Sequence, residues 1–215
     1  MFISLCIIKI SILNSGVFHM ENINQIIDSL GLETCLTLDE IPKIDLYMDQ
    51  VIQLFENKFN ATKRNEDEKV LTKTMINNYA KGKLIFPIQN KKYSKEHLIL
   101  ISLIYQLKGA LSINDIKVTL NGLNKKIVNE ELDLDSFYAS YLHLTGQNAA
   151  DFKVDIAERV KDVKEEIAVT EKESSAYLEQ VLMISSLVHM SNLYRRVAEK
   201  LVDEMVVEKE GKRQK

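Results

Sequence analysis

The longest uninterrupted feature of this sequence is a stretch of sixty residues, 148–207, that contains neither proline nor glycine. Because these two residues are the usual interruptions of helices, the stretch predicts long helices. In its first half, apolar residues recur every three or four positions and so share one helical face: Phe152, Ile156, Val160, Val163 and Ile167. The pattern weakens at residues 170–175, which predicts a turn or kink between two helices.

The second of these helices, over residues 177–205, carries an apolar face wider than the narrow seam of a coiled coil. Two interpretations fit this width: packing into the core of one chain, or contact between two copies in a homodimer. The positions concerned are Leu178, Val181, Leu182, Leu187, Val188, Leu193, Tyr194, Val197, Leu201 and Met205. Residues 208–215 follow as a basic, frayed tail.

The composition favours a mainly α protein. Two prolines and seven glycines in 215 residues are few, and no segment alternates as a strand would. A formal net charge of −3 argues against a nucleic-acid surface over the whole chain, so any such surface must be local.

The two cysteines, Cys6 and Cys35, lie far apart and form no CxxC pattern. We therefore expect neither a metal site nor a disulfide framework, which suits the reducing cytoplasm.

The first 19 residues are apolar, with Lys9 in the middle of the run. A secretory signal would place its positive charge first, and the run is too short to span a membrane. We expect that translation begins at Met20 instead of Met1; the alternative is a disordered or membrane-touching tail. In either case residues 1–19 are not part of the fold.

Between these two regions the chain predicts a series of helices. Residues 95–108 are almost continuously apolar, so this helix should be central. A helix over 45–59 should begin with Asp45 as its N-cap. The polar residues 60–69 that follow form a solvated loop or the start of the next helix. We further expect helices over 21–30, closed by Gly31, over 113–120, stopped by Asn121-Gly122, and over 137–144, ended by Gly146.

One segment, residues 72–95, holds six lysines and no acidic residue. Thr72 can cap a helix that ends at Gly82, with an apolar inner face of Met75, Ile76, Tyr79 and Ala80. Residues 89–93 form a basic loop that fits a wing. Ser94 is a good N-cap for the next helix, but His97 stands where a capping box needs Glu or Gln.

The segment from Leu71 to Lys117 resembles the winged helix-turn-helix of the MerR type. That family has a capped helix, a Gly-Leu-Leu-Pro-like phrase, a basic wing and a helix that starts with Tyr-Ser. The corresponding phrases here are TKTMINNYAK, KLIFP, QNKK and YSKEHL. The phrases IDLYMDQV, TKTMINNYAKGKL, KKYSKEHL and LSINDIK are also similar to the bacterial domain-of-unknown-function family 1836 (DUF1836), over residues 38–144.

The MerR resemblance implies a mainly α fold with a small β wing at most. Residues 20–146 would form the helix-turn-helix domain, and 147–207 the helices for packing or dimerisation. It implies that the protein binds double-stranded DNA and regulates transcription. The implied DNA-binding residues are Lys73, Thr74, Asn77, Asn78, Lys81, Lys83, Lys91, Lys92 and Tyr93. The recognition helices of MerR-type proteins usually carry Arg-Tyr at the position of Asn77-Asn78. Asparagine can nevertheless pair bidentately with adenine.

The alternative to DNA binding is a solvated or protein-binding face, and hence a non-catalytic helical interaction or adaptor module. The placement of the lysines favours DNA, because phosphate contacts require positive charge on one exposed side. His97, His143 and His189 lack the spacing of metal ligands, and no phosphate loop or catalytic motif is present. We expect no enzymatic activity, no cofactor and no metal.

Overall fold

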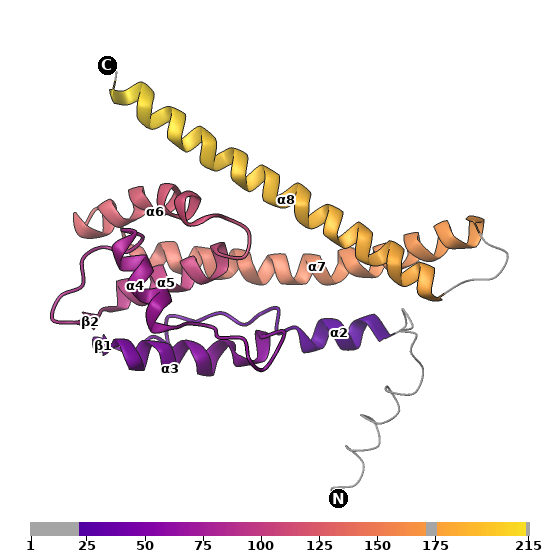
Figure 1. Ribbon diagram of the computed structural model, residues 1–215, viewed down its shortest axis with the longest axis horizontal. Coiled ribbons are helices and arrows are strands. Elements are labelled where there is room, and N and C mark those ends of the chain that lie inside the picture. Colours follow the sequence, from indigo (N-terminus) through magenta and orange to yellow (C-terminus); the bar gives the residue numbers. More distant parts are fainter. Residues whose placement is uncertain (1–21, 171–175, 214–215) are drawn as a thin grey trace, which may run out of the picture. The chain divides into compact units, whose positions relative to one another are not determined.

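The computed structural model describes residues 22–170 and 176–213 (Figure 1). Their elements are α2 (Ile23–Ser29), β1 (Leu46–Tyr47), α3 (Met48–Phe59), the 3-10 helix η2 (Asn60–Thr62), α4 (Lys73–Lys81), β2 (Lys92–Tyr93), α5 (Lys95–Leu107), α6 (Ile113–Val128), α7 (Leu134–Thr170) and α8 (Ala176–Arg213). The prediction of a mainly α fold is confirmed. Residues 1–19 lie outside the described residues.

The described residues divide into two compact units. One comprises residues 22–29, 150–170 and 176–191, and buries Ile156, Val163 and Ile167 of the predicted helical face. The other comprises residues 30–149 and 192–213 and contains α3 to α6. The division into 20–146 and 147–207 stays a prediction.

The core of the larger unit is organised around α5. Eight consecutive residues of this helix, 97–104, are buried. Its neighbours contribute Phe55 and Phe59 from α3, Ile76 from α4 and Tyr138 from α7. The Tyr138 hydroxyl donates to the carbonyl of Leu36 (2.7 Å) and lies 2.9 Å from Ser102 Oγ. Because packing partners surround α5, nearly all of its positions must be apolar, and the predicted central role is confirmed.

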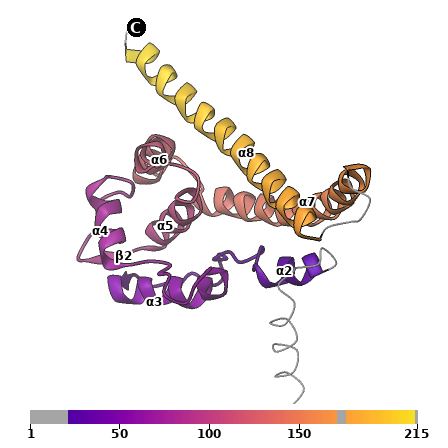
Figure 2. The same cartoon turned by 45° about the vertical axis from the view of Figure 1, so that its right-hand side comes forward.

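Helix α3 begins later than predicted. Leu46 and Tyr47 are extended and pair antiparallel with Tyr93 and Lys92, so Asp45 cannot cap the helix. Tyr47 occupies the N-cap instead, and its N–H donates to Gln50 Oε1 at 2.8 Å. Figures 1 and 2 both show β2 close to α3. A strand contact with residues 92 and 93, far along the chain, therefore sets the start of this helix.

Two expected helix stops are wrong. Helix α6 continues through Asn121-Gly122 to Val128, and α7 continues through Gly146 to Thr170. A glycine inside a helix costs about 1 kcal/mol relative to alanine, which tertiary packing readily outweighs. Beyond Gly122, Leu123 packs against the core and Asn124 is buried, so continuation of α6 gains contacts.

The predicted break after α7 falls at residues 170–175. Helix α7 ends at Thr170 and α8 begins at Ala176, while residues 171–175 lie outside the described residues. The backbone of α8 is helical through Arg213, where a frayed tail was expected from residue 208.

Among the described residues, no helix is both long and apolar enough to cross a membrane.

Candidate nucleic-acid interface

Helix α4 has one buried side and one polar, exposed side. Thr72 caps it as predicted, because its Oγ1 accepts from the N–H of Met75 at 3.1 Å. Ile76 and Tyr79 are buried on the inner side. The outer side exposes all five residues predicted there, Lys73, Thr74, Asn77, Asn78 and Lys81.

The turn after α4 exposes Lys83 in an unusual backbone conformation. The N–H of Leu84 donates to the carbonyl of Tyr79 (2.9 Å) and that of Lys83 to Ala80 (3.1 Å), which is a Schellman motif. Lys83 holds the left-handed position with φ +59°, where glycine is usual. Gly82 ends the helix as predicted; a Cβ there would lie 2.7 Å from Leu84 Cδ1, so the end of the Leu84 side chain would have to shift.

The predicted wing is a tight turn between Gln89 and Lys92. The N–H of Lys92 donates to the carbonyl of Gln89 at 2.9 Å. The central residues Asn90 and Lys91 have φ values of +50° and +58°, as in a type I′ turn. Lys91 is exposed at the tip, and the pairing of Tyr93 with Leu46 fixes the base of the turn to the start of α3.

His97 anchors the wing from within the core. Its Nδ1 accepts from the N–H of Ser94 at 3.1 Å, so His97 does complete the capping box that was not expected. Since a backbone N–H can only donate, the ring proton sits on Nε2, which donates to the carbonyl of Phe86 at 3.2 Å. The ring also packs on Phe86 and Tyr93.

Burial lowers the pKa of His97 below its ordinary value of 6.5, only partly offset by the hydrogen bond to Phe86. The neutral form is also the one that can accept from Ser94. His97 is therefore an uncharged structural residue that joins the wing to α5.

Tyr93 is not part of the exposed surface. Its side chain is only 2% exposed and belongs to the hydrophobic core, and burial raises its pKa. The prediction that Tyr93 contacts DNA is therefore not supported. The reason is that Tyr93 lies in β2 with its ring turned to the inner side, against His97.

The lysines differ in their partners. Lys73 forms a solvent-exposed ion pair with Asp49 (2.7 Å), and Lys95 pairs with Asp135. Lys92 lies 5.4 Å from the centre of the Tyr47 ring, in a cation–π contact. Lys81, Lys83 and Lys91 form no ion pair within the described part of the chain. Their positive charge is therefore available to an external anion.

Sequence reasoning missed two further residues at this surface. Asn124 of α6 is buried and donates through Nδ2 to the carbonyls of Leu84 (2.9 Å) and Leu120 (3.0 Å), so it holds the turn that presents Lys83. Tyr47 is an exposed aromatic beside Lys92. Neither had a signal in the sequence, since Asn124 lay beyond the expected end of a helix at residue 120 and Tyr47 lay inside an expected helix.

These features define a small helical module with one basic, polar face. Residues 36–141, just under half of the chain, match the family described as Domain of unknown function (DUF1836). This match confirms the resemblance to that family over this segment. Neither a curated protein nor a solved structure matches the chain. Within residues 22–170 and 176–213, no three His, Cys, Asp or Glu side chains cluster as metal ligands would.

Proposed function

We propose that residues 36–141 form a MerR-like winged helix-turn-helix that binds double-stranded DNA and regulates transcription. Helix α4 acts as the recognition helix and the turn at Gln89–Lys92 as the wing. The major groove of DNA is wide enough for a helix such as α4. Lysines on its outer side and on the wing contact phosphates, and Asn77 and Asn78 face the base edges.

Several structural features support this proposal. Helices α3 and α4 contact each other, as the two helices of a helix-turn-helix do. The β1–β2 pairing fixes the wing to the start of α3. The segment between the two helices, residues 60–72, is longer than a tight turn, but its Val70 and Leu71 are buried and so hold it against the core.

The observation that carries the proposal is the conformation of Lys83 and Lys91. A left-handed backbone costs about 1 kcal/mol or more for a residue with a Cβ, and glycine avoids this cost. Both positions instead hold an exposed lysine that forms no ion pair with any described residue. A strained backbone that carries a charged side chain on the surface is better explained by binding than by stability.

The proposal is tested by binding of a labelled mixed-sequence DNA duplex over a range of salt concentrations. Five lysines, at positions 73, 81, 83, 91 and 92, give an expected slope of log K against log salt of about −4 to −5 per protomer. The double variant Lys81→Glu/Lys91→Glu should weaken binding at every salt concentration and reduce the slope by about 2.

The matched control is Lys161→Glu/Lys164→Glu, which makes the same charge change at exposed positions of α7. This control should bind DNA as the unmodified protein does. Salt-independent binding, or equal loss in both double variants, would contradict the proposal. If the Lys81→Glu/Lys91→Glu variant instead loses a protein partner with its melting temperature unchanged, the adaptor alternative is favoured.

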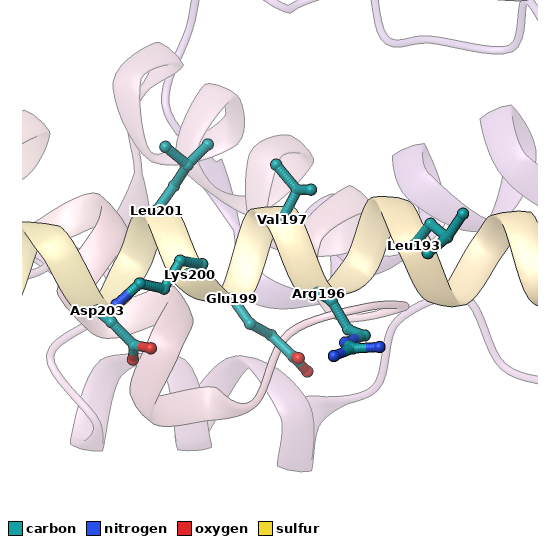
Figure 3. A pocket seen from close by; sticks show the side chains of 7 residues that line it. All are labelled: Leu193, Arg196, Val197, Glu199, Lys200, Leu201 and Asp203. Carbon is teal, nitrogen blue, oxygen red and sulfur yellow. The ribbon is translucent and has the colours of Figure 1, made fainter.

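We further propose that the DNA-binding form is a homodimer that pairs through α8. Tyr194, Val197 and Leu201 have the i, i+3, i+7 spacing of a helical seam and are all more than half exposed. Figure 3 shows Val197 and Leu201 on one side of α8, with Arg196, Glu199 and Asp203 on the opposite side. A second copy of α8 would cover this seam, and pairing would place two basic faces on successive turns of DNA.

Sedimentation velocity tests the homodimer. The double variant Val197→Glu/Leu201→Glu should sediment as a monomer at concentrations where the unmodified protein is a dimer. Arg196→Glu, on the opposite side of the same helix, should leave the dimer intact. A concentration-independent monomer for the unmodified protein would remove this part of the proposal and leave DNA binding by the monomer to be judged separately.

A further inference from the structure

We propose that the groove formed by α5, α6, the start of α7 and Met205 of α8 binds an amphipathic organic anion, with an apolar body and a single acidic headgroup such as a carboxylate. This site is separate from the face of α4 and from the wing. The inference goes beyond DNA binding and does not depend on it.

The groove has the size and lining of a small-molecule site. It encloses about 530 Å³, within the range of roughly 300–1,000 Å³ that is usual for ligand pockets. Apolar side chains from four helices line it: Leu103 and Leu107 from α5, Leu120 and Leu123 from α6, Phe137 and Tyr141 from α7, and Met205 from α8, with Leu132 just before α7. Leu103 and Leu120 are buried, and Phe137 is 42% exposed. An apolar ligand body would gain contact with all four helices.

The charge of the lining selects the headgroup. Among the described residues that line the groove, Lys126 has the only charged side chain, and Gln106 and Thr119 add two polar groups. Lys126 is exposed in the last turn of α6 and forms no ion pair in the part of the chain that the structure describes. An anionic headgroup would therefore find a free ammonium next to the apolar space, whereas a cationic headgroup would be repelled.

Gly122 offers a way to fill the groove without disturbing the helix. It lines the groove from α6, and a Cβ at this position would meet no atom within 4 Å. A leucine can therefore begin its side chain here without a clash at Cβ, and it has a higher helix propensity than glycine. Gly122→Leu should therefore compete with the ligand for space while the fold is retained.

Decanoate is a suitable probe, and isothermal titration calorimetry with the full chain measures its binding without DNA. Decanoate should bind, and decyltrimethylammonium, which has an equally long chain and the opposite charge, should bind at least tenfold more weakly. Lys126→Glu should weaken decanoate binding about tenfold or more. The matched control is Lys125→Glu, because Lys125 is an exposed neighbour that does not line the groove, and it should change binding less than twofold.

Gly122→Leu should abolish decanoate binding with an unchanged or higher melting temperature. Equal binding of the anion and the cation would overturn the inference, as would the absence of decanoate binding at millimolar concentration. Equal effects of Lys126→Glu and Lys125→Glu would overturn it too. Because no DNA is present, failure here leaves the proposed DNA binding untouched, and failure of DNA binding leaves this site untouched.

Discussion

Helices α5 and α8 are both rich in aliphatic residues, but they bury them to very different degrees. In α5, residues 97–104 are all buried. In α8, over residues 176–207, only Glu179, Met183 and Val202 are buried, while Tyr194, Val197 and Leu201 are among the many exposed apolar residues.

The difference shows that hydrophobic content alone does not make a helix central. Helix α5 has neighbours from α3, α4, α6 and α7, so its side chains are removed from water within one chain. Helix α8 exposes apolar side chains at a helical spacing that a partner could cover. The helices around α5 therefore bury its side chains, whereas α8 carries apolar surface that the described residues leave uncovered.

The largest expected effect comes from a matched truncation in the two helices. Ile101→Ala in α5 should lower the free energy of unfolding by about 3 kcal/mol, because Ile101 is fully buried and a cavity remains. Val197→Ala in α8 should lower the free energy of unfolding of the monomer by less than about 0.5 kcal/mol, because Val197 is 62% exposed within one chain. Urea denaturation at a protein concentration low enough for the chain to be monomeric measures both. Equal losses in the free energy of unfolding would show that the two helices do not differ in burial.

A second, smaller effect concerns two tyrosines. Tyr138→Phe removes the buried hydroxyl that meets Leu36 and Ser102 beside α5, and should cost about 1–2 kcal/mol. Burial also raises the pKa of Tyr138 to about 12, which is consistent with a sequestered phenol. Tyr194→Phe in α8 should leave the thermal stability of the monomer unchanged, because the Tyr194 side chain is 72% exposed within one chain. A larger loss for Tyr194→Phe at a concentration where the protein is monomeric would show that the chain itself covers α8.

The stability of the folded protein should depend on pH through His97, beside α5. The pKa of His97 is lowered from 6.5 in the folded protein, so the unfolded chain binds more protons as the pH falls below 6.5. The stability contributed by neutral His97 is complete above pH 6.5 and is lost on acidification. In His97→Gln, the glutamine can accept from the N–H of Ser94 but does not titrate. The loss of stability on acidification that is due to His97 should therefore vanish.

Melting temperatures measured from pH 7.5 to pH 5 check the prediction for His97. His189→Gln, at an exposed position of α8, is the control and should keep the pH dependence of the unmodified protein. The same pH dependence in His97→Gln and in the unmodified protein would show that His97 is not the group responsible.

The smallest expected effect is an increase in stability. Lys91→Gly should raise the free energy of unfolding by about 0.5–1 kcal/mol, because glycine accepts the φ of +58° without strain. Lys164→Gly, at an exposed position inside α7, should lower it by about 1 kcal/mol. Thermal denaturation compares the two. A loss in both variants would show that the turn at Lys91 is not strained, and would remove the main support for the proposed interface.

Part of the fold and of the basic face could be predicted from the sequence. The Thr72 cap, the inner side of α4 with Ile76 and Tyr79, and the central role of α5 are all confirmed. The position of Gly31 after the first helix is confirmed too, by its φ of +60°. Each of these features depends on residues within one or two turns of the same helix, where spacing and capping rules operate.

The features that were missed depend on distant partners. Tyr47 belongs to a strand because Lys92 pairs with it, and Asn124 is helical and buried because Leu84 accepts its hydrogen bond. His97 completes a capping box that usually requires Glu or Gln, because the core keeps its ring neutral. No local pattern identifies such residues.

The helical character of this protein, the basic outer side of one helix and the apolar, central α5 all follow from the amino-acid sequence. The start of α3, the continuation of α6 and α7 through their glycines, the burial of Tyr93 and the exposure of Lys83 and Lys91 emerge only in the folded chain. The two groups differ because helix formation and amphipathicity are local properties. Burial and strand pairing are set by contacts between residues far apart in the chain.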